Sequence, residues 1–432
     1  MGTKAPNGDG VMGYHVHFGG GAIGLACVYP ALKEGSRHVV IVNRVGRRFD
    51  RRRKEFADWR SYRKALGGRM GTLAIDIEEV GPPGGREQDK MDPPTLHLVM
   101  PSMRKRVLST AQLRELKETI AEEDAYVMTS DLTQLADLFE GAESFSCALR
   151  KGQKHVAGVL VQCRIKPCPV YVFENNDEFT PALGKTWKGV ATRVIVDRIC
   201  IQHPAEYSRG RNRLVEHVSC ERDVELQSIR VIGSPPSYWK PVAAEHFGFF
   251  EKKKRYMVNC VHTALAILGY SHLCKKHIPA DHQSRQVLSI VVDGLLIDPE
   301  NRRIIDVFLS GKAIQLLVEE SDGLRPSEFA DDEDAFTKLV SGGRRVLERM
   351  SAFPDEIGRV LQKEDTDDEK AHPKMLDRVT RYVKDLKQSI AAEGPDSRRD
   401  AYRSFAARNR PHVREIECAI ESILDAWKSL MS

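Results

Sequence analysis

Two stretches of the sequence combine residue types and spacings that could carry out chemistry. The first is the glycine-rich run Gly19-Gly20-Gly21-Ala22-Ile23-Gly24, which comes directly after the strand-like run Tyr14–Phe18. A helix-compatible stretch and the buried apolar run His38–Val42 follow it. Strand, glycine turn, helix and strand thus fit within about 30 residues, the length of a βαβ unit. This context predicts a dinucleotide-binding turn.

The glycines of this turn have separate expected roles. Gly19 makes the tight turn, Gly21 lets a pyrophosphate approach the backbone, and Gly24 lets the helix pack closely. The N-terminus of the helix that begins around Ala22 and Ile23 offers unpaired N–H groups and the positive end of its dipole to phosphates. The alternative interpretation is a glycine-rich turn that binds no ligand.

The end of the second strand bears on the choice of cofactor. An acid at this place binds the adenosine ribose hydroxyls of NAD, but this strand ends in Asn43-Arg44, and Arg47 follows within a cluster of basic residues. An acid would repel a 2′-phosphate, whereas Asn followed by Arg accepts one with hydrogen bonds and charge. The cofactor is therefore expected to be NAD or NADP, with NADP favoured. The rest of the cluster is interpreted as a solvated helix face.

The second stretch contains Lys254, Asn259 and His262. Asn259 and His262 share a helix face, and Lys254 is expected near the start of that helix. There the helix dipole and burial both disfavour a cation, so the lysine could be neutral near pH 7 and act as a general base. Asn could stabilise a developing oxyanion, and His could orient a substrate. Alternatively, a buried Asn and His satisfy one another while the lysines reach solvent, and the residues alone leave both interpretations open.

These three residues also carry a resemblance to a known family. Lys, then Asn five residues on, then His three further, is the signature of the polyol-specific long-chain dehydrogenases. Within that family, His17–Gly24 is similar to the opening of the mannitol-1-phosphate 5-dehydrogenases. Two further motifs resemble those of the family, namely Val172-Phe173-Glu174-Asn175 and Val196-Asp197-Arg198-Ile199. The similarity extends in order from residue 17 to about residue 270 and so covers most of the chain.

The resemblance implies a mechanism that needs no metal, because lysine takes the role of zinc in other alcohol dehydrogenases. Lys254 would be the general base for alcohol oxidation and the general acid for ketone reduction. Asn175 and Asn259 would hold the developing oxyanion, and His262 would help to position the substrate. Hydride would pass between the substrate carbon and the nicotinamide C4. Two supporting residues are expected, Asp197 and, as a proton relay, Glu251.

The sequence also departs from the family pattern. Ala22 and Leu25 stand where mannitol-1-phosphate 5-dehydrogenases usually carry Asn and Arg. A Pro/Gly-rich insertion at about residues 81–94 and the basic cluster after Asn43 are unusual as well. These departures leave open the phosphate on the substrate, the sugar and the cofactor more than the class of reaction.

The scaffold that positions these residues is expected to be an α/β domain followed by a helical one. Strand candidates at 96–100, 125–128 and 170–173 alternate with helix candidates at 110–122 and 132–139, which predicts a parallel sheet. After about residue 250 the pattern becomes helical, and apolar residues from Val413 to Leu430 form one stripe of a last helix. The sequence predicts an N-terminal Rossmann-type domain at 12–250 and a mainly α-helical substrate domain at 251–432.

Composition limits the remaining possibilities. Lys and Arg number 66 and Asp and Glu 61, a formal net charge of +5, and the basic cluster has few interleaved aromatic residues, so no nucleic acid partner is expected. Nine cysteines without close pairing suit a reducing compartment and lack zinc spacing, so no metal is expected. No apolar run is long enough to span a membrane. A cytoplasmic monomer or small homo-oligomer is the expectation.

The favoured interpretation is an NAD(P)-dependent enzyme of mannitol metabolism. It would interconvert a polyol or polyol phosphate and a ketose or ketose phosphate, with mannitol 1-phosphate and fructose 6-phosphate as the favoured pair. One alternative is a hexuronate oxidoreductase of the mannonate or altronate type. Another is a nucleotide-binding sensor or scaffold without catalysis, although drift would be expected to break the Lys254, Asn259 and His262 set first.

Overall fold

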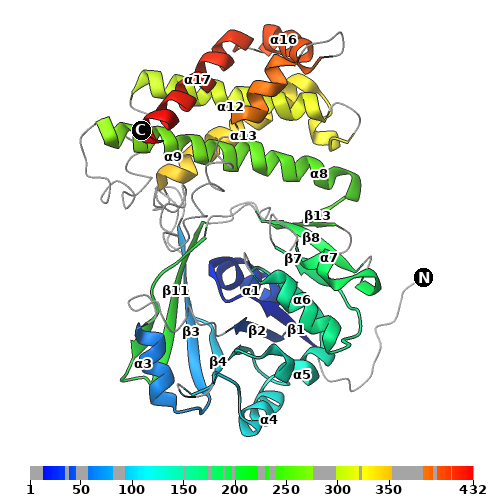
Figure 1. The fold of residues 1–432 in the computed structure, drawn as a ribbon, viewed down its shortest axis with the longest axis vertical. Coiled ribbons are helices and arrows are strands. Elements are labelled where there is room, and N and C mark those ends of the chain that lie inside the picture. The colour runs from blue at the N-terminus through cyan, green and yellow to red at the C-terminus, as the bar shows by residue number, and fades with distance from the viewer. Residues whose placement is uncertain are drawn as a thin grey trace. The chain divides into compact units, whose positions relative to one another are not determined.

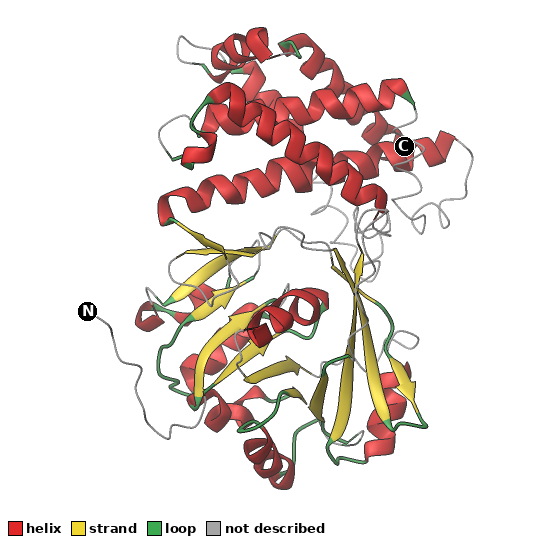
Figure 2. Ribbon diagram, turned by 180° about the vertical axis from the view of Figure 1, so that it is seen from behind, coloured by secondary structure: helices red, strands yellow, loops and turns green. Residues whose placement is uncertain are grey.

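The structure is a computed structural model that divides the chain into two units. It describes residues 13–34, 38–44, 57–80, 93–102, 104, 106–149, 152–173, 178–187, 190–196, 200–221, 229–232, 240–275, 298–320, 324–352, 383–392, 397–409 and 411–431. One unit comprises the described residues up to Val242, and the other those from Ala243 onward. The described strands all belong to the first unit, and the second is helical (Figure 1; Figure 2).

Six parallel strands form the centre of the first unit. In sheet order they are β5 (Ala125–Thr129), β2 (His38–Arg44), β1 (Tyr14–Phe18), β6 (Ala142–Cys147), β7 (Val170–Val172) and β8 (Ala191–Val196). Numbered along the chain these strands run 3-2-1-4-5-6, the order of a doubly wound dinucleotide fold. The order reverses at β1, which pairs in parallel with both β2 and β6. The predicted Rossmann-type α/β fold is confirmed.

Helices cover both faces of this sheet because successive strand residues point to opposite sides. Val39 and Ile41 pack with residues 25–32 of the first helix, which comprises the π-helical η1 (Gly24–Val28) and α1 (Tyr29–Glu34). Val40 and Val42 pack on the other side against the remaining helices. These are α4 (Thr110–Thr119), the 3₁₀ turn η2 (Leu132–Leu135), α5 (Ala136–Glu140), α6 (Gln153–Gln162), α7 (Phe179–Leu183) and the 3₁₀ turn η3 (Lys185–Trp187).

The sheet extends past β5 and β8. Past β5 lie β4 (Thr95–Val99), β3 (Gly71–Val80), β11 (Arg213–Glu221) and β10 (Glu206–Ser208), with β9 (Cys200–Gln202) also paired to β11. Past β8 lie β12 (Ile229–Ile232) and β13 (Lys240–Val242). Of the strands in these extensions, the sequence analysis predicted only β4, as its candidate at 96–100. Several of these pairs are antiparallel, so the sheet is mainly parallel rather than wholly so. Helix α3 (Ala57–Leu66) lies beside β10 and β11.

The second unit is built from long helices. They are α8 (Ala244–Lys253), the π-helical η4 (Lys254–Cys260), α9 (Val261–Lys275), α12 (Pro299–Glu319), α13 (Asp332–Ala352), the helical segment 383–391, α16 (Arg398–Asn409) and α17 (Val413–Met431), with a 3₁₀ turn η5 (Ser327–Phe329). In α17 the expected apolar stripe is confirmed by the burial of Ile416, Ile420 and Ile423. The predicted domain boundary at residue 250 falls inside α8.

Glycines let the long helices of this unit approach one another closely. A Cβ at Gly311 of α12 would lie 2.8 Å from a methyl group of Ile416 in α17, and one at Gly343 of α13 would lie 2.2 Å from a methyl group of Leu309 in α12. Any larger residue at these two crossings would push the helices apart. No helix within the described ranges is long and apolar enough to cross a membrane.

Candidate functional site

The glycine turn lies at the point where the strand order reverses. Gly19 follows β1 directly, and its φ of +128° lies in the region that favours glycine. A Cβ at Gly19 would also lie 2.7 Å from the carbonyl oxygen of Ala148. The Gly19 N–H donates to Val42 at 3.1 Å, and the Ala148 N–H donates to Phe18 at 2.9 Å. The turn is thereby held between the carboxyl ends of β2 and β6, where doubly wound sheets bind ligands.

Gly21 and Gly24 differ in the way the predicted roles require. A Cβ at Gly24 would lie 2.1 Å from the Gly19 carbonyl oxygen and 2.6 Å from Nε2 of His17, so only glycine fits there. A Cβ at Gly21 would meet no atom within 4 Å. Ala22 and Ile23 begin the helix, and the Leu25 N–H bonds to the Gly21 carbonyl at 3.0 Å. The first N–H groups of a helix have no partner within it, so those at the start of this helix point out of its N-terminal end.

Gly20 packs against a cluster of polar side chains that sequence reasoning missed. We call this cluster, which includes Tyr126 and Asn43, the floor of the turn. A Cβ at Gly20 would lie 1.8 Å from the Tyr126 hydroxyl oxygen. That hydroxyl accepts a hydrogen bond of 3.0 Å from Nδ2 of Asn43, whose Oδ1 accepts one from the Arg44 backbone N–H at 3.0 Å. Asn43 therefore ties the end of β2 to the floor of the turn. Arg44 is exposed, and Arg47 lies outside the described residues.

A buried carboxyl group belongs to the same floor. The side chain of Gln202 donates to the Gly20 carbonyl at 3.3 Å and to Oε2 of Glu216 at 3.0 Å, and Trp59 Nε1 donates to Oε1 of Glu216 at 2.5 Å. Glu216 is only 2% exposed. Burial raises its pKa to about 7, although these two hydrogen bonds and His217 oppose the rise.

This shift predicts a pH-dependent stability. The folded chain holds the Glu216 proton between about pH 4.5 and about pH 7, where the unfolded chain has released it, so the contribution of Glu216 falls as pH rises through this window. The free energy of unfolding of Glu216→Gln relative to the natural protein should therefore rise by about 3 kcal/mol across this window. Urea titrations of both proteins measure the difference. If the difference in the free energy of unfolding between the two proteins did not change with pH, the raised pKa of Glu216 would be contradicted.

His15 and His17 make buried hydrogen-bond contacts with serines of the neighbouring strand β6. Nδ1 and Nε2 of His15 lie 2.8 and 2.6 Å from the hydroxyls of Ser144 and Ser146, and Nδ1 of His17 lies 2.7 Å from Ser146. Burial lowers the pKa of His17 to about 3, against the effect of the Gly19 carbonyl, so its ring is neutral at physiological pH. These rings fix the strands beneath the glycine turn.

A hollow of about 390 Å³ opens beside the carboxyl end of β5. It is lined by residues 130–133 and by one side of α6 from Lys154 and His155 to Gln162. Burial lowers the pKa of His155, and the positive charge of Arg44 lowers it further. The sequence analysis did not find this hollow, because its walls come from segments with no chemical motif.

The residues of the second predicted site lie on one continuous helix of the second unit. The prediction that Lys254 is near a helix N-terminus is wrong, because α8 begins ten residues earlier at Ala244 and continues into η4. The helix dipole therefore gives no reason for a neutral lysine at this position. Ala243 at the N-cap makes no side-chain capping bond, so the sequence carried no start signal there.

The π-helical geometry of η4 brings Lys254 and Asn259 onto one face. In a π-helix residues five apart are joined by one hydrogen-bonded turn, so Asn259 follows Lys254 by one turn. In an α-helix the same pair would be about 140° apart. Lys254, Asn259 and His262 are half-buried, whereas Tyr256, Met257, Cys260 and Val261 are buried. Glu251 is also half-buried and lies on α8, three residues before Lys254.

The two lysines before Lys254 have local partners. Lys252 forms ion pairs with Glu319, at 3.8 Å, and with Glu320. Nζ of Lys253 lies 5.1 Å from the centre of the Phe329 ring. Asn175 and Asp197 lie outside the described residues, so their expected roles stay predictions. Within the ranges the structure describes, no group of three His, Cys, Asp or Glu residues could hold a metal ion.

Comparisons with known proteins find similarity only among solved structures. No family model matches the sequence, and no curated protein matches it. A PanE/ApbA family ketopantoate reductase from Ralstonia eutropha JMP134 is 12% identical, with a TM-score of 0.44 over 94% of this chain and 99% of that one. A D-mandelate dehydrogenase in complex with NADH is 8% identical, with a TM-score of 0.39 over 95% and 99%. A glycerol-3-phosphate dehydrogenase from Coxiella burnetii is 10% identical, with a TM-score of 0.33 over 96% and 99%.

These three proteins are one reductase and two dehydrogenases by name. The assignment of the fold rests on the strand order of the sheet itself and does not depend on them. The resemblance to the polyol-specific long-chain dehydrogenases is not matched by a family model and stays a prediction.

Proposed function

We propose that this protein is an NAD(P)-dependent dehydrogenase that interconverts a polyol, or polyol phosphate, and the corresponding ketose. The observation that supports this most is the glycine turn at the reversal point of a 3-2-1-4-5-6 parallel sheet. The open space at Gly21 and the closed packing at Gly24 fit a dinucleotide whose pyrophosphate approaches Gly21. The mannitol 1-phosphate and fructose 6-phosphate pair is favoured by the sequence resemblance.

The cofactor would be held by the glycine turn and by the end of β2. The N–H groups at the start of the helix would donate to its pyrophosphate. When bound, the nicotinamide supplies the centre that accepts or gives up a hydride. Because Asn43 already bonds Tyr126, the exposed Arg44 is the described residue best placed to pair with a 2′-phosphate.

The helix of the second unit would handle the proton. Lys254 would remove the proton from the substrate hydroxyl during oxidation and return it during reduction. Asn259, one π-helical turn away, would donate a hydrogen bond to the same oxygen as negative charge develops on it. His262, one further turn along, would bind a neighbouring hydroxyl group. The chemistry of Lys254 needs burial or a substrate-bound state to lower its pKa, since it lies far from a helix N-terminus.

The role of Arg44 gives a prediction on cofactor choice. Arg44→Ala should weaken the binding of NADPH by roughly 10-fold, because it removes one charge-assisted contact to the 2′-phosphate, and should leave NADH binding unchanged. Calorimetric titration of both nucleotides measures the two changes. Equal weakening for NADH and NADPH, or none for either, would contradict a 2′-phosphate contact at Arg44.

Turnover tests the proposed function directly. The change in reduced-nicotinamide absorbance would be followed with NAD and NADP against a panel of polyols, polyol phosphates and hexuronates, and in the reverse direction with the ketoses. Turnover of mannitol 1-phosphate supports the favoured pair, and turnover of mannonate or altronate alone would replace it with the hexuronate reaction. Binding of the dinucleotide without turnover of any of these compounds would overturn the dehydrogenase proposal.

A further inference from the structure

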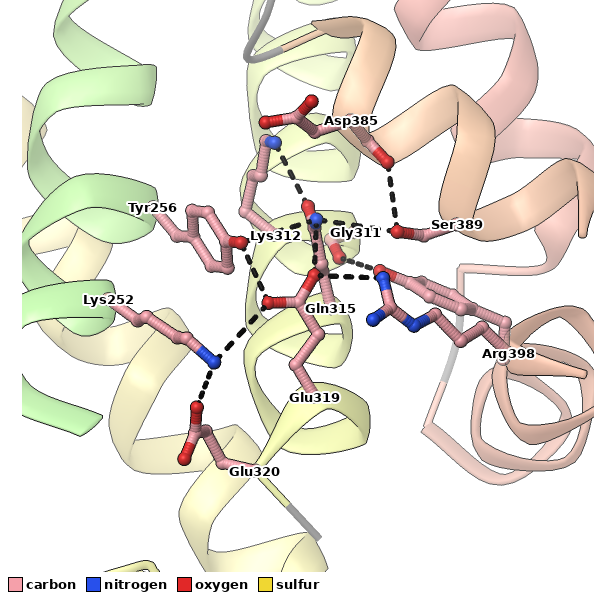
Figure 3. Close-up of polar contacts among 11 residues, drawn as sticks. Lys252, Tyr256, Gly311, Lys312, Gln315, Glu319, Glu320, Asp385, Ser389 and Arg398 are labelled. Carbon is pink, nitrogen blue, oxygen red and sulfur yellow. Dashed lines mark hydrogen bonds and ion pairs between the residues drawn. The ribbon is translucent and has the colours of Figure 1, made fainter. Parts of the chain in front are cut away.

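A row of buried polar side chains crosses the interior of the helical unit (Figure 3). Lys312, Gln315 and Glu319 follow one another at spacings of three and four on α12, and so share one face of that helix. Nζ of Lys312 donates to Oε1 of Gln315 at 3.0 Å, and Nε2 of Gln315 donates to Oε1 of Glu319 at 2.8 Å. Lys312 is fully buried and Gln315 is 1% exposed. Burial lowers the pKa of the Lys312 amine, and Cys260, Asp385 and Glu319 oppose that effect.

Stability alone does not account for such a row. Removing a cation from water costs free energy, and apolar side chains of similar volume often replace buried charges with no loss of stability. The surroundings of Lys312 on α12 are apolar, since Phe308, Leu309, Ala313 and Leu316 are all buried. A leucine or methionine would suit this position better if packing were its only purpose.

On one side, the row contacts the segment that carries the predicted catalytic residues; on the other, Arg398 pairs with Glu319 at 3.6 Å. The Tyr256 hydroxyl donates to Oε2 of Glu319 at 2.8 Å, and Nζ of Lys312 lies 5.0 Å from the centre of the Tyr256 ring. The ammonium thus holds the ring of Tyr256 while the carboxylate holds its hydroxyl. Lys252, at the end of α8, pairs with the same carboxylate of Glu319. Figure 3 shows Lys252, Tyr256 and Arg398 converging on Glu319 from other helices.

Tyr256 lies between Lys254 and Asn259 on the π-helical segment η4. π-Helices are rare, and α-helical hydrogen bonding is the competing arrangement for any such segment. A return to α-helical geometry would move Asn259 about 140° around the axis from Lys254. Whatever fixes Tyr256 therefore also fixes the relative position of these two residues.

We propose that Lys312 and Glu319 are positioning residues, which hold η4 in its π-helical register through Tyr256 and so keep Lys254 and Asn259 on one face. This inference rests on the proposed function, in which both of these residues act on the substrate oxygen. Lys312 and Glu319 act on the reaction only through Tyr256 and make no contact with the substrate themselves.

Two variants separate positioning from a purely structural role. Lys312→Met removes the ammonium and keeps an unbranched side chain, and Tyr256→Phe removes only the hydroxyl. Each should lower kcat by roughly 10- to 100-fold, as a displaced catalytic group does, with little change in KM. The pH profile of kcat should shift, because the surroundings of Lys254 change.

Lys312→Met should keep or raise the melting temperature. A purely structural role would instead lower the melting temperature and leave kcat and the pH profile as they are.

Ser389→Ala is the matched control, because Ser389 accepts a 3.4 Å hydrogen bond from Gln315 on the side of the network away from η4. It should leave kcat and the pH profile unchanged. Hydrogen exchange of the backbone amides of residues 254–260 gives a second readout that needs no substrate. The exchange should become faster in Lys312→Met and in Tyr256→Phe, and should not change in Ser389→Ala.

The outcomes separate this inference from the proposed function. If Lys254→Ala abolishes turnover while Lys312→Met and Tyr256→Phe keep natural kcat values and exchange rates, the positioning role is overturned and the dehydrogenase stands. If no compound is turned over, the exchange measurement still decides whether the row anchors η4. Unchanged exchange in both variants overturns the anchor.

Discussion

Replacing Lys254 with alanine is expected to lower kcat for the proposed polyol substrate by roughly 10³-fold, the amount that general acid–base catalysis typically contributes. The proposed cofactor site belongs to the other unit and does not include Lys254, so the dissociation constant of the dinucleotide should stay the same. Initial rates at saturating substrate and a cofactor titration measure the two effects. Addition of a small primary amine such as ethylamine should restore part of the rate, because the amine can enter the space left by the side chain and carry the proton.

Lys253→Ala is the control, since it removes the same charge one residue earlier. Nζ of Lys253 lies over the Phe329 ring and not on the face that Lys254 shares with Asn259, so its loss should change kcat by less than about 3-fold. Equal effects of the two substitutions would point to the charge of the lysine run as a whole. Full activity of Lys254→Ala would remove the general acid–base role from this residue.

Replacing Gly21 with valine is expected to weaken dinucleotide binding on the order of 100-fold while the melting temperature stays within about 2 °C of the natural protein. Gly21 is exposed, and the space around its Cβ position is open, so the folded chain accommodates the side chain. The methyl groups would then occupy the space that the pyrophosphate is proposed to enter. Calorimetric titration and a thermal melt measure the two quantities.

Substitutions at two other glycines serve as controls for this result. Gly248 of α8 is also exposed with open space around it. Gly248→Val should therefore leave both dinucleotide binding and the melting temperature close to those of the natural protein. Gly24→Val should destabilise the first unit, because its Cβ would overlap the Gly19 carbonyl. Normal binding by a stable Gly21→Val protein would mean that the pyrophosphate does not lie at this turn.

The features that sequence reasoning predicted well are those encoded within short segments. The run Tyr14–Phe18 is buried on both faces, and the turn after it needs glycine at Gly19 and Gly24, so strand, turn and helix follow from local rules. In α17 the apolar residues recur at helical spacing, and the buried face is the one that the spacing predicts.

The features that were missed depend on contacts between distant segments. Strands β3 and β11 are separated by more than 130 residues in sequence, yet they pair in parallel along most of their lengths. One signal was present in β11, where Glu216 lies on the same face of the strand as the apolar residues Leu214, Val218 and Cys220. A carboxyl group in the apolar phase of a strand indicates a buried polar partner, here Trp59.

The π-helical segment η4 had no sequence signal at all. Helical spacing rules place residues three or four apart on one face and so separate Lys254 from Asn259. The polar side chains that contact the segment come from α12, which begins about 40 residues later in the sequence. Lys312 could have been noticed as a charge within an apolar stretch, but its contact with Tyr256 depends on the packing of the helices.

The central claim is that the glycine turn of the first unit binds a nicotinamide dinucleotide. Calorimetric titration of the purified protein with NADH and with NADPH, combined with hydrogen exchange of residues 19–25, tests it most directly. The account predicts binding of one dinucleotide per chain, tighter for NADPH, with slower exchange at the turn in the bound state. No binding of either nucleotide at about 1 mM, or binding that leaves the exchange at the turn unchanged, would contradict it.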